Sequence, residues 1–457
     1  MTVRGRDATL VPLQDALRAT DADEAELWVH RRRAAITRYA KNEIHQNAVA
    51  DETHVQARVV VGRSMGIASA NSLDPADLRR LVADAKAAAQ ESAPNAEWPG
   101  LTPLELPREE AEPKAFDPAT ARADAGSQAE AIRRITTAAK ERGFRAAGTH
   151  QIELSEDALA NTHGVATYAP STMAYLRALV TSDTGTGWAE DLGWSTSSLD
   201  PSGVAARAID KAALDRDRTQ LAPGDYQAVF EELAVAEVLR FMSLTGLTGQ
   251  TLKDGRSFMK DRFGEQVTGA NFSLWDDALD PRTLAIPFDV EGTPKRRVAL
   301  VERGVAKGVV HDRQSARWFD THSTGHAADP RRYSVGGHAG NLTMAGGDAT
   351  REQLIASVKR GVLITRFHYT NTPDPKRATM TGTTRDGTFL IEDGRVTHAL
   401  ANVRYTMSAL DLFSGIELLG PQRLARDWWS SNGMGSIVCL CPPIKVARAT
   451  ITGSSPI

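Results

Sequence analysis

The stretch Ser72-Leu73-Asp74-Pro75 occurs a second time, unchanged, as Ser198-Leu199-Asp200-Pro201. In each copy the aspartate is suited to cap the start of a helix, and the proline to its first turn, where a missing N–H costs nothing. An alanine-rich run follows both copies, so both predict the start of a helix. The repeat indicates that the first part of the chain contains two related structural units.

Strand-like segments precede both of these helices. We therefore predict two β-β-β-α units, packed as one α/β domain over residues 1–220. A predicted helix at residues 125–140 begins the second unit, and a proline-rich stretch at residues 94–118 with an acidic run at 109–112 connects the two units as an exposed segment. The strand-like segments are residues 26–33, 44–47, 55–70, 150–154, 165–168 and 173–181.

The pattern changes after residue 220, and residues 221–457 predict a β-rich, sandwich-like or barrel-like domain with few helices. Residues 233–244 form a helix with apolar side chains on nearly every side, which is typical of a buried helix. Residues 300–304 and 390–394 predict hairpins with a glycine in the turn. A capping box at Thr350 predicts one more helix, ending near Gly361. The fold class is α+β.

The overall composition excludes several classes of protein. A net charge of −3 over 457 residues gives no reason to expect a nucleic-acid or membrane partner. Arg31-Arg32-Arg33 is a short basic cluster within a strand-like segment, so we interpret it as a solvated strand face. Two cysteines exclude a disulfide framework, and the first residues lack the apolar core of a secretory signal. We expect a cytoplasmic protein.

Ser64 lies in Gly62-Arg63-Ser64-Met65-Gly66, which matches the G-x-S-x-G pattern of serine hydrolases. That pattern makes a nucleophile only on a strand–turn–helix elbow. The residues that follow Ser64 instead predict the return strand of a hairpin, which favours a structural serine.

His322 and His326 are four residues apart, a spacing that would place both on one face of a helix for a metal ion. The intervening Ser-Thr-Gly is a poor helix interior. No histidine in the chain is followed by glutamate, so the H-E-x-x-H pattern is absent. Structural histidines are the favoured interpretation.

Two further candidates carry weaker signals. Cys439 and Cys441 lie on the same face of a predicted strand, where small buried side chains are the default interpretation. The glycine-rich loop at residues 336–341 matches neither phosphate-binding pattern, which favours a shaped loop. No candidate establishes an active site.

The second half of the chain resembles the TldD/PmbA (TldE) family through an ordered series of short motifs between residues 220 and 457. The motifs are Pro223-Gly224-Asp225-Tyr226, Gly255-Arg256-Ser257-Phe258, Phe263-Gly264-Glu265-Gln266, Phe288-Asp289-Val290-Glu291-Gly292-Thr293-Pro294, Ser323-Thr324-Gly325, Gly340-Asn341-Leu342 and the hairpin at residues 381–394.

The resemblance implies a peptidase of two subunits. In the family, the TldD subunit holds a metal with an H-E-x-x-x-H helix and a later cysteine, and the TldE or PmbA subunit lacks these ligands. By distance from the flanking motifs, the metal helix falls here at residues 239–244, and the cysteine would precede a turn at residues 430–435. The residues at the helix positions are Leu239, Arg240, Phe241, Met242, Ser243 and Leu244.

The resemblance therefore predicts a non-catalytic subunit. It would form a heterodimer with a TldD-like chain that carries the zinc, and the complex would hydrolyse peptide or peptide-like amide bonds. No catalytic, cofactor-binding or metal-binding residue is assigned to this chain. Two alternatives stay open: a homodimeric binding or scaffold protein of the same fold, and an independent hydrolase that uses His322 and His326.

Overall fold

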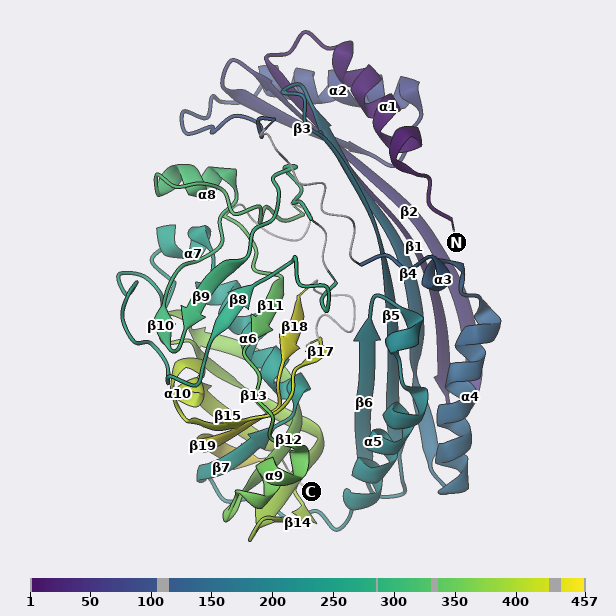
Figure 1. Ribbon diagram of the computed structural model, residues 1–457, viewed down its shortest axis with the longest axis vertical. Helices are drawn as coiled ribbons and strands as arrows, with labels where there is room; N and C mark the ends of the chain where they lie inside the picture. Colours follow the sequence, from purple (N-terminus) through teal and green to yellow (C-terminus); the bar gives the residue numbers. More distant parts are fainter. Residues whose placement is uncertain (1, 105–114, 285–286, 330–335, 427–436, 456–457) are drawn as a thin grey trace.

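The computed structural model describes residues 2–104, 115–284, 287–329, 336–426 and 437–455. The first half forms one long antiparallel sheet, which stands beside a second half built from two further sheets (Figure 1). The protein is therefore α+β, as the sequence predicts. The acidic run at 109–112 and the turn at 430–435 lie outside the described residues.

The N-terminal sheet confirms the two β-β-β-α units. Each unit contributes three consecutive strands and then a helix, and the units meet along their first strands, β1 and β4. The order from edge to edge is β3 (Ser64–Ala70), β2 (Glu43–Val61), β1 (Glu24–Ala40), β4 (Arg145–Asn161), β5 (Ala166–Thr181) and β6 (Thr186–Gly193).

The strand boundaries differ from the predicted ones. Residues 55–70 contain the end of β2, a turn at Gly62 and all of β3. Residues 165–168 and 173–181 belong to the single strand β5, and the sequence pattern does not predict β6. Pro170 is tolerated inside β5 because it pairs only with Glu156 of β4, while β6 joins β5 from Ala174 onward.

The helices of the repeat begin as predicted. Asp74 accepts a hydrogen bond from the N–H of Ala76 at 2.8 Å, and Asp200 accepts one from Gly203 at 2.9 Å. Apolar side chains of these helices pack on one face of the sheet together with α1 and α4. The helices are α1 (Arg6–Arg18), α2 (Pro75–Gln90), α3 (Pro118–Arg122), α4 (Ala125–Glu141), the 3₁₀ helix η1 (Thr196–Ser198) and α5 (Pro201–Leu214).

Five strands of the second half close into a barrel, because β13 pairs with both β15 and β12. This agrees with the predicted β-rich, barrel-like domain. We propose residue 220 as the domain boundary, since the first barrel strand starts shortly after it. The barrel strands are β12 (Arg360–Asp374), β7 (Gly224–Phe230), β19 (Ile444–Ser454), β15 (Val403–Ser408) and β13 (Thr379–Glu392), with β14 (Arg395–Ala399) and β16 (Ile416–Leu419) attached to β13 and β19.

The remaining sheet contains β10 (Val305–Ala306), β9 (Val298–Glu302), β8 (Leu274–Asp276), β11 (Asn341–Met344), β18 (Val438–Cys441) and β17 (Arg423–Ala425). Both predicted hairpins form, and their turn residues Gly304 and Gly394 have φ of 80° and 73°. The helices of this half are α6 (Glu232–Gly246), α7 (Gly249–Lys253), α8 (Arg313–Trp318), α9 (Arg351–Ala356), η2 (Pro375–Arg377) and α10 (Ala409–Ser414). The capping box at Thr350 is present, but its helix α9 ends before Gly361, which lies in β12.

A buried polar network joins the N-terminal sheet to the barrel. The Arg366 guanidinium of β12 lies 4.3 Å from the ring centroid of Trp188 in β6 and forms an ion pair with Asp386 of β13. Asp386 also accepts a hydrogen bond of 2.9 Å from the hydroxyl of Thr186 in β6. These contacts fix the relative position of the two halves. In the described part of the chain, no helix is long and apolar enough to cross a membrane.

Candidate functional site

Helix α6 lies at the centre of the second half and is buried on nearly every side. Leu239 is 0% exposed, and the helix belongs to the core cluster that includes side chains of both C-terminal sheets. The predicted buried helix is thereby confirmed, with a start at Glu232 and an end at Gly246. Its all-round apolar surface follows from having a layer of strands on more than one side.

The segment that the resemblance assigns to a metal helix carries packing residues and one arginine. Leu239 and Met242 are buried. The Arg240 guanidinium lies 5.1 Å from the ring centroid of Phe241. Ser243 donates a hydrogen bond of 2.6 Å from its hydroxyl to the carbonyl oxygen of Ala339. Each side chain therefore has a structural role.

A buried acid–histidine pair lies near this end of α6. His326 Nε2 and Asp276 Oδ1 are 2.9 Å apart, and both side chains are 0% exposed. Asp276 also accepts a hydrogen bond of 3.0 Å from the N–H of Asn341. Burial alone would raise the pKa of Asp276, but the charge and hydrogen bond of His326, with help from Lys295, lower it to about 2.

His338 completes this polar region. Burial lowers its pKa to about 3, and the positive charges of Lys295 and Arg240 act in the same direction, against the opposing effect of Asp276. His338 is therefore neutral near pH 7. Lys295 and His338 line the same cavity.

The residues at this end of α6 do not fit zinc. Zinc requires thiolate, imidazole or carboxylate ligands in a roughly tetrahedral set, and a guanidinium cannot ligate it. Within the described ranges, no group of three or more histidine, cysteine or acidic side chains is placed to hold a metal ion. Arg240 and Lys295 would also repel a divalent cation.

The pairing of Asp276 predicts a pH-dependent contribution to stability. A carboxyl group whose folded pKa is depressed stabilises the fold above its unfolded pKa, near 4, and loses that contribution as the pH falls toward 2. We expect Asp276→Asn to lower the free energy of unfolding by about 1 kcal/mol more at pH 6 than at pH 3. Urea unfolding of both proteins at the two pH values measures this loss. A loss of unfolding free energy that is the same at pH 6 and pH 3 would contradict the prediction.

A cavity of about 290 Å³ separates the inner face of the N-terminal sheet from the loops beside α6. Side chains from both halves line it, including Glu153 and Ser155 from β4, and Lys295 and His338 from the second half. On the sheet side, His30 Nδ1 lies 3.0 Å from Asp157 Oδ1. The walls combine charged side chains of both signs with apolar side chains such as Trp28 and Met173, which suits binding of a chain that has polar and apolar groups.

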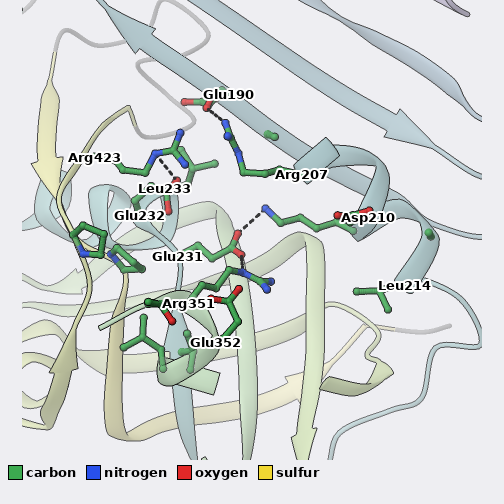
Figure 2. A pocket seen from close by; sticks show the side chains of 18 of the residues that line it. Glu190, Arg207, Asp210, Leu214, Glu231, Glu232, Leu233, Arg351, Glu352 and Arg423 are labelled. Atoms are coloured by element: carbon green, nitrogen blue, oxygen red, sulfur yellow. Dashed lines mark hydrogen bonds and ion pairs between the residues drawn. The ribbon is translucent and has the colours of Figure 1, made fainter. Parts of the chain in front are cut away.

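A larger pocket of about 830 Å³ lies between α5 and the N-terminal end of α6 (Figure 2). Glu231 is its electrostatic centre, with Lys211 at 2.6 Å and Arg351 at 3.1 Å. Burial alone would raise the pKa of Glu231, but these two cations lower it to about 2. Lys211 and Arg351 are therefore already neutralised by Glu231, which makes them poor binding partners for an anionic ligand.

The other candidate site residues from the sequence, Ser64 and the pair His322 and His326, lie apart from one another in the structure. Ser64 begins β3 directly after the β2–β3 turn, so it lies in a hairpin as predicted and not on a nucleophile elbow. His322 and His326 do not share a helix face: His326 is buried against Asp276, while His322 is exposed. These positions agree with structural roles.

Both cysteines are buried thiols that are not joined in a disulfide, and they pack on α6. The Cys439 thiol lies 3.8 Å from the carbonyl oxygen of Ala236, and the Cys441 thiol lies 3.4 Å from that of Glu232. The glycine-rich loop at 336–341 packs on α7 and α8. Gly336 has a φ of 117°, and its N–H donates to Asp312 at 2.6 Å. Residues 336–341 therefore form a structural loop, in agreement with the interpretation of the sequence.

Sequence reasoning misses the residues that surround α6. Asp276 and His326 are 50 positions apart, and nothing in either local pattern marks a partner. In the sequence, His338 stands out only as part of a glycine-rich loop. A buried aspartate that ends a short strand is a weak signal, because strands often end in acidic turn residues.

The fold and site together define a class of protein: a two-unit sheet beside a barrel domain, with a central buried helix next to an interdomain cavity. The sequence matches the PmbA/TldA metallopeptidase domain 1 over residues 25–89 and the PmbA/TldA metallopeptidase C-terminal domain over residues 223–453. The chain belongs to the PmbA/TldD metallopeptidase family.

Solved structures share the fold at low sequence identity. TldE from Thermococcus kodakarensis superposes with a TM-score of 0.88 at 21% identity, covering 97% of this chain and 100% of that one. A protein from Thermotoga maritima described as a modulator of a DNA gyrase gives a TM-score of 0.81 at 18% identity, covering 94% and 96%.

Among curated proteins, a metalloprotease TldD homolog from Haemophilus influenzae is 26% identical over 179 residues. The match covers 38% of this chain and only 36% of the Haemophilus protein. The similarity therefore concerns a part of that protein.

Proposed function

We propose that this chain is the non-catalytic subunit of a two-subunit metallopeptidase of the TldD/TldE type. The observation that carries the proposal is the content of α6: Leu239 and Leu244 stand where the family's metal helix has histidines, and Arg240 stands where it has glutamate. The similarity of the whole fold to a TldE supports the same assignment.

In this proposal the catalytic zinc belongs to the TldD-type partner, where it would activate a water molecule for attack on an amide bond. The substrate is a peptide or a peptide-like molecule. This chain would supply structural support for the partner and part of the wall around the substrate, including the polar side chains of Glu153, Ser155 and His338. A net charge of −3 offers no support for a nucleic-acid partner.

We also propose a cytoplasmic location, because the two cysteines are buried thiols not joined in a disulfide, as is usual in proteins of reducing compartments. A homodimeric binding protein of the same fold is the alternative outcome of the experiment below.

Reconstitution tests the proposal. We expect a 1:1 complex when this chain is co-expressed with a TldD-type chain carrying H-E-x-x-x-H, with peptidase activity in the complex and none in this chain alone. Replacing a metal-binding histidine of the partner should abolish activity, whereas His322→Ala here, at an exposed position, should leave it unchanged. The proposal would be overturned if this chain formed homodimers and did not bind the TldD-type chain. It would also be overturned if His322→Ala removed the peptidase activity.

A further inference from the structure

One edge of the N-terminal sheet is left open over part of β2. On one side β2 pairs with β1 along its whole length. On the other side β3 pairs only with residues 55–61. Residues 46–54 therefore have one strand neighbour among the described elements. We call residues 46–54 the open edge. Figure 1 labels β2, which contains these residues, and β3, the last strand of the sheet on this side.

The hairpin fixes which backbone groups point outward at the open edge. Val61 and Ser64 flank the two-residue turn and form its closing pair, so the N–H and C=O of Val61 point toward β3. Alternate residues of β2 share this direction. The irregularity in the β1–β2 register lies before residue 46, so the alternation continues unbroken through the open edge. Its outward-pointing backbone groups belong to Asn47, Val49, Asp51 and Thr53.

The open edge lacks the features that usually protect such strands from pairing. Lysine, proline and bulges commonly block edges, and residues 46–54 contain no lysine or proline. Val49 presents an apolar side chain that is 61% exposed. The acidic groups are matched across the sheet, with Asp51 at 2.8 Å from Arg33 and Glu52 at 3.6 Å from Arg32. An approaching strand would therefore meet little net charge, while the Asp51 carboxylate, 46% exposed, stays accessible to a further basic partner.

We propose that the open edge pairs with an extended strand of the metal-bearing partner subunit, an inference that rests on the proposed function. Nine residues span about 30 Å and offer about eight outward hydrogen bonds. The substrate is a less suitable occupant, because none of these residues lines the interdomain cavity.

A second copy of this chain is also less suitable as the occupant. Residues 46–54 contain no lysine or arginine, so antiparallel self-pairing gives Asp51 neither of these residues opposite it in any register, and the register centred on Ala50 sets it against the apolar Val49. A partner strand with an apolar residue opposite Val49 and a basic one opposite Asp51 matches the edge better. We therefore expect the partner's strand to carry an apolar and a basic residue at these two positions.

Amide hydrogen exchange tests the pairing directly on the unmodified chain. Peptides covering residues 46–54 should exchange on the order of tenfold more slowly in the 1:1 complex than in the free chain, since pairing removes their outward N–H groups from water. Unchanged exchange in a complex that forms and is active would overturn this inference and leave the proposed function intact.

A pair of proline variants supplies a matched comparison. Val49→Pro removes one outward N–H at the open edge, and Ile67→Pro removes one at the outer edge of β3, where the side chain is also exposed. We expect Val49→Pro to weaken the complex on the order of tenfold or more, and Ile67→Pro to change its Kd by less than about twofold. Equal effects would contradict the pairing, as would a homodimer formed through residues 46–54. Absence of any complex with the unmodified chain would instead reject the proposed function.

Discussion

Leu239→Ala is expected to lower the free energy of unfolding by about 2–5 kcal/mol. Leu239 is completely buried in the core cluster around α6, so its truncation removes apolar contacts and leaves a cavity between two sheets. The surrounding strands are held by their own hydrogen bonds and cannot collapse fully into the space. Urea unfolding followed by circular dichroism measures the change.

Leu244→Ala provides the matched control on the same helix. Leu244 is only partly buried, so the same chemical change should cost clearly less than at Leu239. These two positions would hold the histidines of a metal helix. A loss at Leu239 no greater than that at Leu244 would contradict the view that α6 serves packing here.

Asp386→Asn is expected to lower the free energy of unfolding by about 3–5 kcal/mol. The substitution keeps an acceptor for Thr186 but removes the charge that neutralises the buried Arg366 guanidinium. Arg366 would then remain buried beside Trp188 without its ion-pair partner, at the contact between the sheet and the barrel, and Glu190 would be the acid left to interact with it. Thermal and urea unfolding should both register the loss.

An exposed ion pair gives the comparison for this second prediction. Asp15 and Arg18 pair within α1 with side chains that are mostly open to solvent. Asp15→Asn should change the free energy of unfolding by less than about 1 kcal/mol, because water screens such pairs. Similar losses for Asp386→Asn and Asp15→Asn would show that the interdomain network does not hold the two halves together.

Local sequence signals predicted the features that local chemistry determines. Asp74 and Asp200 cap helices because each aspartate precedes a proline and an alanine-rich run, and the structure confirms both caps. The apolar surface of residues 233–244 likewise identified a buried helix. Glycines in the sequence also predicted the positions of both C-terminal hairpin turns, because the left-handed backbone conformation in these turns favours glycine.

Features that depend on distant pairing could not be read from the sequence. The closure of the barrel requires β12 to meet β13 and β7 on opposite sides, which no local pattern specifies. The Asp276–His326 pair and the interdomain contact of Trp188 with Arg366 are likewise created by the fold. The open edge of β2 became visible only when β3 proved too short to cover it.

We propose that the catalytic metal belongs to a partner and that α6 of this chain is a packing helix. Arg240 in α6 is the clearest physical reason, since a fixed positive charge disfavours a divalent cation at that end of the helix.

The zinc content of the purified chain decides whether α6 is a packing helix or part of a metal site. Elemental analysis after dialysis against zinc at micromolar concentration should find far less than one zinc per chain, while the partner or the complex retains its metal. One zinc bound per chain, lost on replacement of residues at 239–244 or of His326 or His338, would contradict the account.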